Sequence, residues 1–151
     1  MRLFLIMLLL LAVIPRESAA ALGEHESSSE KDRKHFHGFR QQVNESGSYV
    51  LNIISTEANV IREYSNPNGM IFAVTWRGFS HPDLTTLLGA HWAEFNTQHN
   101  LDSNRHPQGK RILKMDTSTI KYEEGGRMGS VYGRAYIPSL VPDGVSPEEL
   151  P

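Results

Sequence analysis

Cysteine is absent from the sequence of 151 residues. Without thiols the chain forms no disulfide and supplies no thiolate nucleophile, no Cys-ligated zinc site, no iron–sulfur cluster and no lipid-modified N-terminal cysteine. An excess of one charge is also missing, since 15 Lys and Arg residues stand against 17 Asp and Glu residues and leave a net charge of −2. Such a balance provides no general attraction to nucleic acid or to acidic membranes. The length and the balanced composition fit one small soluble domain.

Long apolar runs are lacking except at the N-terminus, where 16 of the first 21 residues are apolar. Arg2 precedes an unbroken apolar run over residues 3–14, and Pro15 and several small residues follow. This run is shorter than the roughly 20 residues that a bilayer-spanning helix needs. A basic start, a short apolar stretch and small residues at the processing site are typical of a secretory signal peptide. We therefore predict a signal peptide over residues 1–21.

Cleavage of this signal peptide is expected after Ala20 or Ala21, which leaves a periplasmic or secreted chain without a stable membrane anchor. Small exported domains of eukaryotes usually rely on disulfides, whereas many periplasmic proteins do not. The missing cysteine therefore favours a bacterial protein.

Residues 22–46 contain only 4 apolar residues among 25. A segment this polar buries too little surface to hold itself folded. We predict a polar mobile arm, in which a short helix beginning at Ser29 would dock through Phe36 and Phe39 alone.

The region 47–140 has the residue pattern of an α+β domain. Runs rich in aromatic and β-branched residues alternate with turn formers, as antiparallel strands do. Ser80 and Asp83 stand in capping-box spacing before apolar residues that recur on one helical face from Leu84 to Phe95. We predict one main amphipathic helix here, packed on an antiparallel sheet of about five strands arranged as a meander, the helix and a hairpin. Strand candidates are residues 49–54, 60–64, 70–77, 111–115, 119–122 and 128–137.

The candidate strand 70–77 is apolar on both alternations until its end, which predicts a central strand. Trp76, Leu88 and Trp92 are the expected core, and about 94 residues suffice for a domain that folds without disulfides. Three segments are expected to lack helix and strand. Residues 96–110 should form a loop, Glu124-Gly125-Gly126 a turn, and 141–151 a proline-rich tail lying against the surface.

One face of the last strand candidate is aromatic and cationic. Ser130, Tyr132, Arg134 and Tyr136 alternate there with small or aliphatic residues. With Trp76 and Arg77 at the end of the central strand, this face would bind a planar, sugar-like or anionic ligand by stacking and charge-assisted hydrogen bonds. The alternative is that Tyr and Arg simply cover the open face of a sheet.

Catalytic candidates are few and each has a structural alternative. His91 and Glu94 are one helical turn apart and would pair as a base and its orienting carboxylate, but His91 also borders the apolar helical stripe, as a half-buried histidine would. The seven histidines show no zinc-protease spacing, and His35 and His37 lie in a charged segment. We predict no metal site and no cofactor.

Several motifs resemble the Domain of Unknown Function 2844 family. They include Phe72-Ala73-Val74-Thr75-Trp76-Arg77-Gly78, Gly125-Gly126-Arg127-Met128, Gly133-Arg134-Ala135-Tyr136-Ile137-Pro138 and Val141-Pro142-Asp143-Gly144-Val145. Arg127 departs from that family's Gly-Gly-His-Met motif. The resemblance covers nearly the whole mature chain and implies an exported protein of Gram-negative bacteria with no assigned activity and no catalytic residues to carry over.

The resulting expectation is a non-enzymatic periplasmic or secreted module that binds a small ligand or another cell-envelope protein, and not nucleic acid. Two alternatives stay open. One is a small hydrolytic or metal-dependent enzyme that uses His91, Glu94 and His81, and the other is an assembly factor of the cell envelope.

Overall fold

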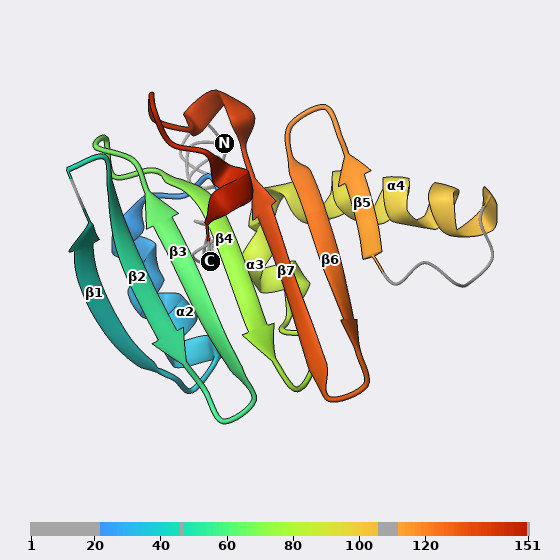
Figure 1. The fold of residues 1–151 in the computed structure, drawn as a ribbon, viewed down its shortest axis with the longest axis horizontal. Helices are drawn as coiled ribbons and strands as arrows, with labels where there is room; N and C mark the ends of the chain where they lie inside the picture. Colours follow the sequence, from blue (N-terminus) through green and yellow to red (C-terminus); the bar gives the residue numbers. More distant parts are fainter. Residues whose placement is uncertain (1–21, 46, 106–111, 151) are drawn as a thin grey trace, which may run out of the picture.

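A seven-stranded antiparallel sheet organises the residues that the computed structural model describes, which are 22–45, 47–105 and 112–150. The predicted signal peptide, residues 1–21, lies outside the described residues. The strand order is β1-β2-β3-β4-β7-β6-β5, so a four-stranded meander and a three-stranded meander meet where β4 pairs with β7 (Figure 1). The strands are β1 (Phe39–Glu45), β2 (Tyr49–Ser55), β3 (Asn59–Ser65), β4 (Ile71–Gly78), β5 (Ile112–Asp116), β6 (Lys121–Arg127) and β7 (Ser130–Tyr136).

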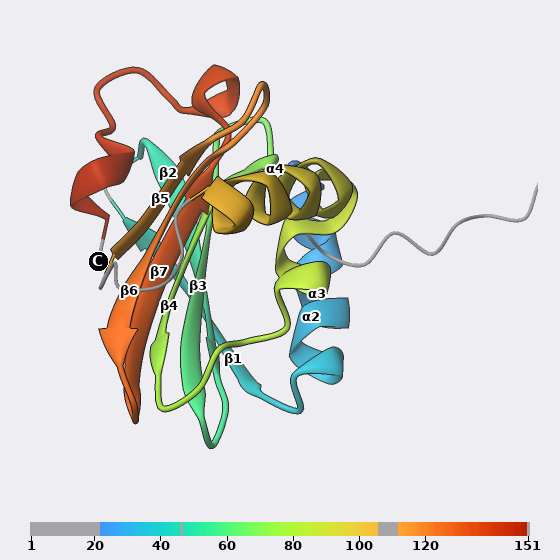
Figure 2. The same cartoon turned by 90° about the vertical axis from the view of Figure 1, so that its right-hand side faces the viewer.

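The two faces of the sheet are covered differently (Figure 2). One side, called the helix face, carries α2 (Ser29–His35), α3 (Leu84–Leu88) and α4 (Trp92–Arg105), with the short 3-10 turns η2 (Glu26–Ser28) and η3 (Gly89–His91). The other side, called the tail face, carries the C-terminal segment with the 3-10 turns η4 (Pro138–Leu140) and η5 (Pro147–Glu149). The fold is therefore α+β, as predicted, with more strands and helices than expected.

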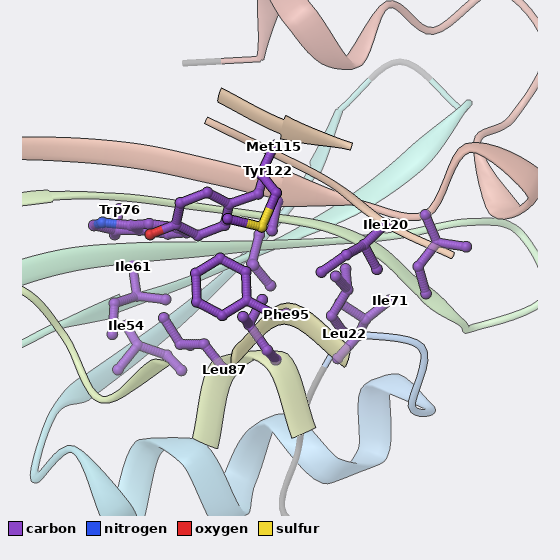
Figure 3. Packing of buried hydrophobic residues seen from close by; sticks show 14 residues of the cluster. Leu22, Ile54, Ile61, Ile71, Trp76, Leu87, Phe95, Met115, Ile120 and Tyr122 are labelled. Atoms are coloured by element: carbon purple, nitrogen blue, oxygen red, sulfur yellow. The ribbon is translucent and has the colours of Figure 1, made fainter. Parts of the chain in front are cut away.

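The main core lies between the helices and the sheet (Figure 3). Trp76 and Leu88, two of the expected core residues, are 1% and 0% exposed, and Trp92 packs at the rim as a partly buried side chain. Strand β4 is buried over six consecutive residues, which confirms its central position. Burying one large apolar side chain contributes about 1.5 to 3 kcal/mol, so these residues contribute strongly to the stability of the domain.

A smaller core on the tail face depends on an irregularity in β4. The pairing of β3 with β4 shifts register, so that Tyr64 faces Ala73 while Ser65 faces Ile71. Phe72 is the extra residue of this bulge, and both it and Ala73 join the tail-face cluster. The C-terminal segment covers this cluster with Leu140, Val141, Val145 and Leu150.

The segment 22–46 differs from the predicted mobile arm, because it contributes α2 and the edge strand β1. Leu22 is 1% exposed within the main core, and its backbone N–H donates to the Leu87 carbonyl at 3.0 Å. The segment could not fold alone, but the rest of the domain supplies the apolar surface and the ladder partners that it lacks. Phe36 packs against the core as expected, whereas Phe39 is 85% exposed.

Two boundaries along the predicted helix and loop also change. The Asp83 carboxylate accepts hydrogen bonds from the Thr85 and Thr86 N–H groups and caps α3, but the helix breaks at Gly89, where φ is +48°. A second helix, α4, then continues to Arg105 through most of the predicted loop 96–110. Its polar side chains fit a helix of which only one side meets the core, and the predicted loop residues 106–110 lie outside the described residues.

The last hairpin turns later than predicted. Residues 125 and 126 belong to β6, and the two residues between the strands are Met128 and Gly129. Gly126 still needs to be glycine, because its φ is +143° and an added Cβ would lie 2.4 Å from the Ser130 carbonyl oxygen.

Candidate functional site

A pocket of about 250 Å³ opens on the tail face over β3, β4 and β7. Three arginines contribute to it, together with a threonine, a tyrosine and one residue of the C-terminal segment. In order along the chain these are Arg62, Thr75, Arg77, Tyr132, Arg134 and Leu150, and Trp76, Glu123 and Gly133 complete the lining.

Strand register explains why residues so distant in the sequence meet here. Arg62 faces Thr75 across β3 and β4, and Thr75 faces Arg134 across β4 and β7. Arg77 faces Tyr132 in the adjacent row. Because residues two apart in a strand point to the same face, both rows project from the tail face.

The charges in the pocket are unequal. Arg134 forms an ion pair with Glu123, with Nη2 2.6 Å from Oε2, and it also donates to the Glu148 backbone carbonyl. The hydrogen bond from Arg134 holds the pKa of the Glu123 carboxyl below its usual range, and Lys114 adds to this effect. Among the described residues, Arg62 and Arg77 form no ion pair with a carboxylate. The pocket therefore has an excess of positive charge.

The aromatic residues predicted for this site are only partly brought together. Tyr132 is 39% exposed and lines the pocket, so its ring is available to a ligand. Tyr136 is 8% exposed and lines a smaller neighbouring hollow of about 160 Å³, where its hydroxyl donates to Glu148. Burial, with the adjacent Glu148, raises the pKa of Tyr136 to about 12. Tyr136 therefore supports the wall and lies outside the main pocket.

Trp76 borders the pocket but turns its indole into the helix-face core, where Figure 3 shows it beside Tyr122. A Cβ added to Gly133 would lie 2.3 Å from the Trp76 ring, so the indole packs directly on the backbone of β7. This close packing fixes the β4–β7 junction and leaves no exposed ring face for stacking.

The structure also brings His91 and Glu94 together, with Thr119 between them. The Glu94 carboxylate accepts from the Ser118 N–H at 2.7 Å and from the Ser118 and Thr119 hydroxyls at 2.6 and 2.5 Å. These hydrogen bonds lower the pKa of Glu94 to about 2. Because the Thr119 hydroxyl donates its hydrogen bond to Glu94, its oxygen accepts one from His91 Nδ1 at 2.9 Å.

These hydrogen bonds connect α4 to the β5–β6 turn, and their geometry does not favour activation of a nucleophile. A general base must accept the proton of the attacking hydroxyl, but the Thr119 hydroxyl donates to Glu94, whose lowered pKa makes it too weak a base to remove that proton. The other nitrogen, His91 Nε2, faces Gly23, where an added Cβ would lie within 3.2 Å. Burial lowers the pKa of His91, which favours the neutral ring.

The remaining histidines of interest have separate partners. His81 Nδ1 lies 2.6 Å from Glu124, and His35 Nε2 lies 3.1 Å from Asp83, linking α2 to α3. Within the residues that the structure describes, no group of three or more His, Asp or Glu side chains could hold a metal ion.

Sequence reasoning missed five pocket residues, which are Arg62, Thr75, Glu123, Gly133 and Leu150. Alternation alone places Arg62 on the face opposite Ile61, but only the β3–β4 register places it beside Thr75 and near Arg134. Nothing in the sequence indicates that the proline-rich tail folds back to bring Leu150 to the rim.

A family model described as "Protein of unknown function (DUF2844)" matches residues 18–150. The chain belongs to the DUF2844 family. This confirms the resemblance seen in the sequence motifs. Searches of the curated proteins and of the solved structures return no match. Membership in DUF2844 assigns no ligand, so any functional proposal depends on the geometry of the pocket.

Among residues 22–45, 47–105 and 112–150 of this DUF2844 protein, no helix is both long and apolar enough to cross a bilayer.

Because the hydrogen bonds of Glu94 are solvent-exposed, we expect Glu94→Gln to destabilise the domain by about 0.5 to 1 kcal/mol at neutral pH. A lowered pKa stabilises the fold above the unfolded value near 4.5, and this contribution is lost as the pH falls toward 2. The difference between wild type and variant should therefore vanish in acid, as urea unfolding would measure. The exposed Glu57→Gln is the control, expected to have little effect at any pH. A variant as stable as wild type at neutral pH would contradict the structural role.

Proposed function

We propose that this DUF2844 protein is an exported, non-enzymatic binding module whose tail-face pocket holds a small anionic ligand. The observation that carries this proposal is the pair Arg62 and Arg77, which share one pocket with no carboxylate paired to either among the described residues. Two guanidinium groups that line one small pocket repel each other, and a bound anion relieves that repulsion.

The pocket chemistry favours a carboxylate or a phosphate. The guanidinium group presents several N–H donors in a planar fork that matches the oxygens of both groups. Arg134 is held in place by Glu123 and by the Glu148 carbonyl, so it acts as a wall of fixed geometry. The anion would therefore bind between Arg62 and Arg77 and be bounded by Arg134.

Tyr132 and Leu150 indicate which chemical groups the ligand carries besides the anionic one. The half-exposed ring of Tyr132 offers a face for stacking, and Leu150 offers an apolar edge. Ligand pockets usually measure about 300 to 1,000 Å³, so a pocket of about 250 Å³ suits a compact ligand, such as a single ring that bears one anionic group.

Export is supported by the N-terminal sequence, with its basic start, apolar run and small residues. We expect mass spectrometry of the exported protein to find a mature chain that begins at Ala21 or Leu22. Deleting residues 3–14 should abolish export because it removes the apolar part of the signal. An intact chain that starts at Met1 and stays in the cytoplasm would contradict this part of the proposal.

Binding can be tested by calorimetry with inorganic phosphate, benzoate and benzamide, the last being a neutral mimic of benzoate. We expect phosphate or benzoate to bind and benzamide not to bind. Hydrogen bonds to charged groups contribute about 1.5 to 3 kcal/mol, so Arg62→Ala or Arg77→Ala should weaken anion binding about tenfold or more.

Arg127→Ala is the matched control, because it removes the same charge from an exposed position that does not line the pocket. Its binding constant should stay within about twofold of wild type, since surface charges act only weakly at a distance. Equal losses in Arg127→Ala and Arg77→Ala, equal binding of benzamide and benzoate, or no binding of either anion would each contradict the proposal.

A further inference from the structure

Two carboxyl groups are buried together between α2 and the sheet. Asp32 on α2 and Glu63 on the helix face of β3 are each 1% exposed. Their side chains interact directly with each other, and Ser29, which is 0% exposed, lies beside Glu63. Acidic side chains are almost never fully buried unless they are paired, so this cluster requires a physical explanation.

The protein provides little compensation for two negative charges at this place. Among the described residues, none of the four carboxyl oxygens has a hydrogen-bond partner of good geometry, and the Ser29 hydroxyl beside Glu63 is a neutral donor that favours its ionised form. A cationic group that acts on Glu63 is Arg40 on β1, and its guanidinium donates to the Asn52 side-chain oxygen at 2.7 and 3.2 Å. Asn52 is the cross-strand partner of Glu63, so Arg40 is held one strand away from that carboxyl.

One shared proton removes both the repulsion between the two carboxyl groups and their lack of a hydrogen-bond donor. Two ionised carboxylates side by side in a low dielectric repel strongly, whereas one proton between them creates a charge-assisted O–H···O⁻ hydrogen bond. With that proton the cluster has one negative charge, which Arg40 balances. We propose that Asp32 and Glu63 form a buried proton-binding site that holds one proton between them at neutral pH, and that α2 docks on the sheet only while this proton is bound.

The electrostatics agree with this geometry. Burial raises the pKa of Asp32 and of Glu63, and the proximity of Glu63 raises the pKa of Asp32 further. A raised carboxyl pKa means that the folded chain binds a proton that the unfolded chain releases near pH 4. The stabilisation is then complete in acid and is lost progressively as the pH rises above that value.

Other charged groups around α2 are arranged differently. Glu30 pairs with Arg33 at 2.6 Å on the solvent side of the helix, and His35 pairs with Asp83 of the adjoining α3. Glu26 in η2 has one buried carboxyl oxygen without a partner among the described residues. Histidines gain charge over the same pH range, so the test compares wild type with a variant at each pH and their contributions cancel.

The test uses the double variant Asp32→Asn with Glu63→Gln, in which two amides of the same shape replace the carboxyls and neither can titrate. The ratio of unfolding constants, wild type over double variant, should rise about tenfold per pH unit between roughly pH 6 and pH 8, because one proton is linked to folding. At each pH, amide exchange of residues 29–36 in wild type, relative to the double variant, should accelerate by the same factor. The control Glu30→Gln should follow the pH dependence of wild type. Parallel pH curves for wild type and the double variant would overturn the proposal.

Infrared spectroscopy of wild type tests the site even if the double variant does not fold. A neutral carboxylic acid has a carbonyl stretch that a carboxylate lacks, and we expect this band at neutral pH. Its absence would overturn the proposal. Loss of the band and of the pH dependence on adding Mg²⁺ or Ca²⁺ would also overturn it, because the pair would then be a cation site.

Discussion

The pairing of β4 with β7 is the interaction on which the rest of the structure depends. It joins the meander β1–β4 to the meander β5–β7, so that one sheet forms from two segments separated by α3 and α4. The Trp76 indole lies against Gly133 in the helix-face core and holds this junction closely packed. On the opposite face the same register places Arg77 beside Tyr132 and Thr75 beside Arg134. This strand pair therefore holds the core together and brings the β7 residues of the pocket beside those of β4, while the β3–β4 register adds Arg62.

The two faces of the sheet have different electrostatic character. Charged side chains on the tail face lie at the rim of an open pocket, where water and ions reach them. On the helix face, Asp32 and Glu63 are closed off by α2, so the protein must neutralise them internally. Both sites are produced by alternation along β3, because Arg62 and Glu63 are neighbours that point to opposite faces. The proposed proton site and the proposed anion site thus share a strand but have independent physical causes.

Several residues of the tail face could be predicted from the sequence, whereas most of the packing of the helices on the sheet could not. Alternation along β7 placed Tyr132 and Arg134 on one face, and the apolar character of β4 showed that it is central. Composition failed for 22–46, because it measures whether a segment can fold alone and ignores the surface that Leu22 and β1 find in the rest of the domain. The pocket residue Arg62 and the Asp32–Glu63 pair depend on contacts between elements distant in the chain, which no local pattern encodes.

We propose that Arg62 of β3 and Arg77 of β4 bind an anion in the pocket that the β4–β7 junction completes. NMR titration of the ¹⁵N-labelled protein with benzoate tests it most directly, because each backbone amide and arginine Nε reports its own surroundings. We expect saturable shifts confined to tail-face positions of β3, β4 and β7, with the Nε signals of Arg62 and Arg77 changing most and Arg127 unchanged. Shifts scattered over the surface, or concentrated at His91, Glu94 and the β5–β6 turn, would contradict the claim.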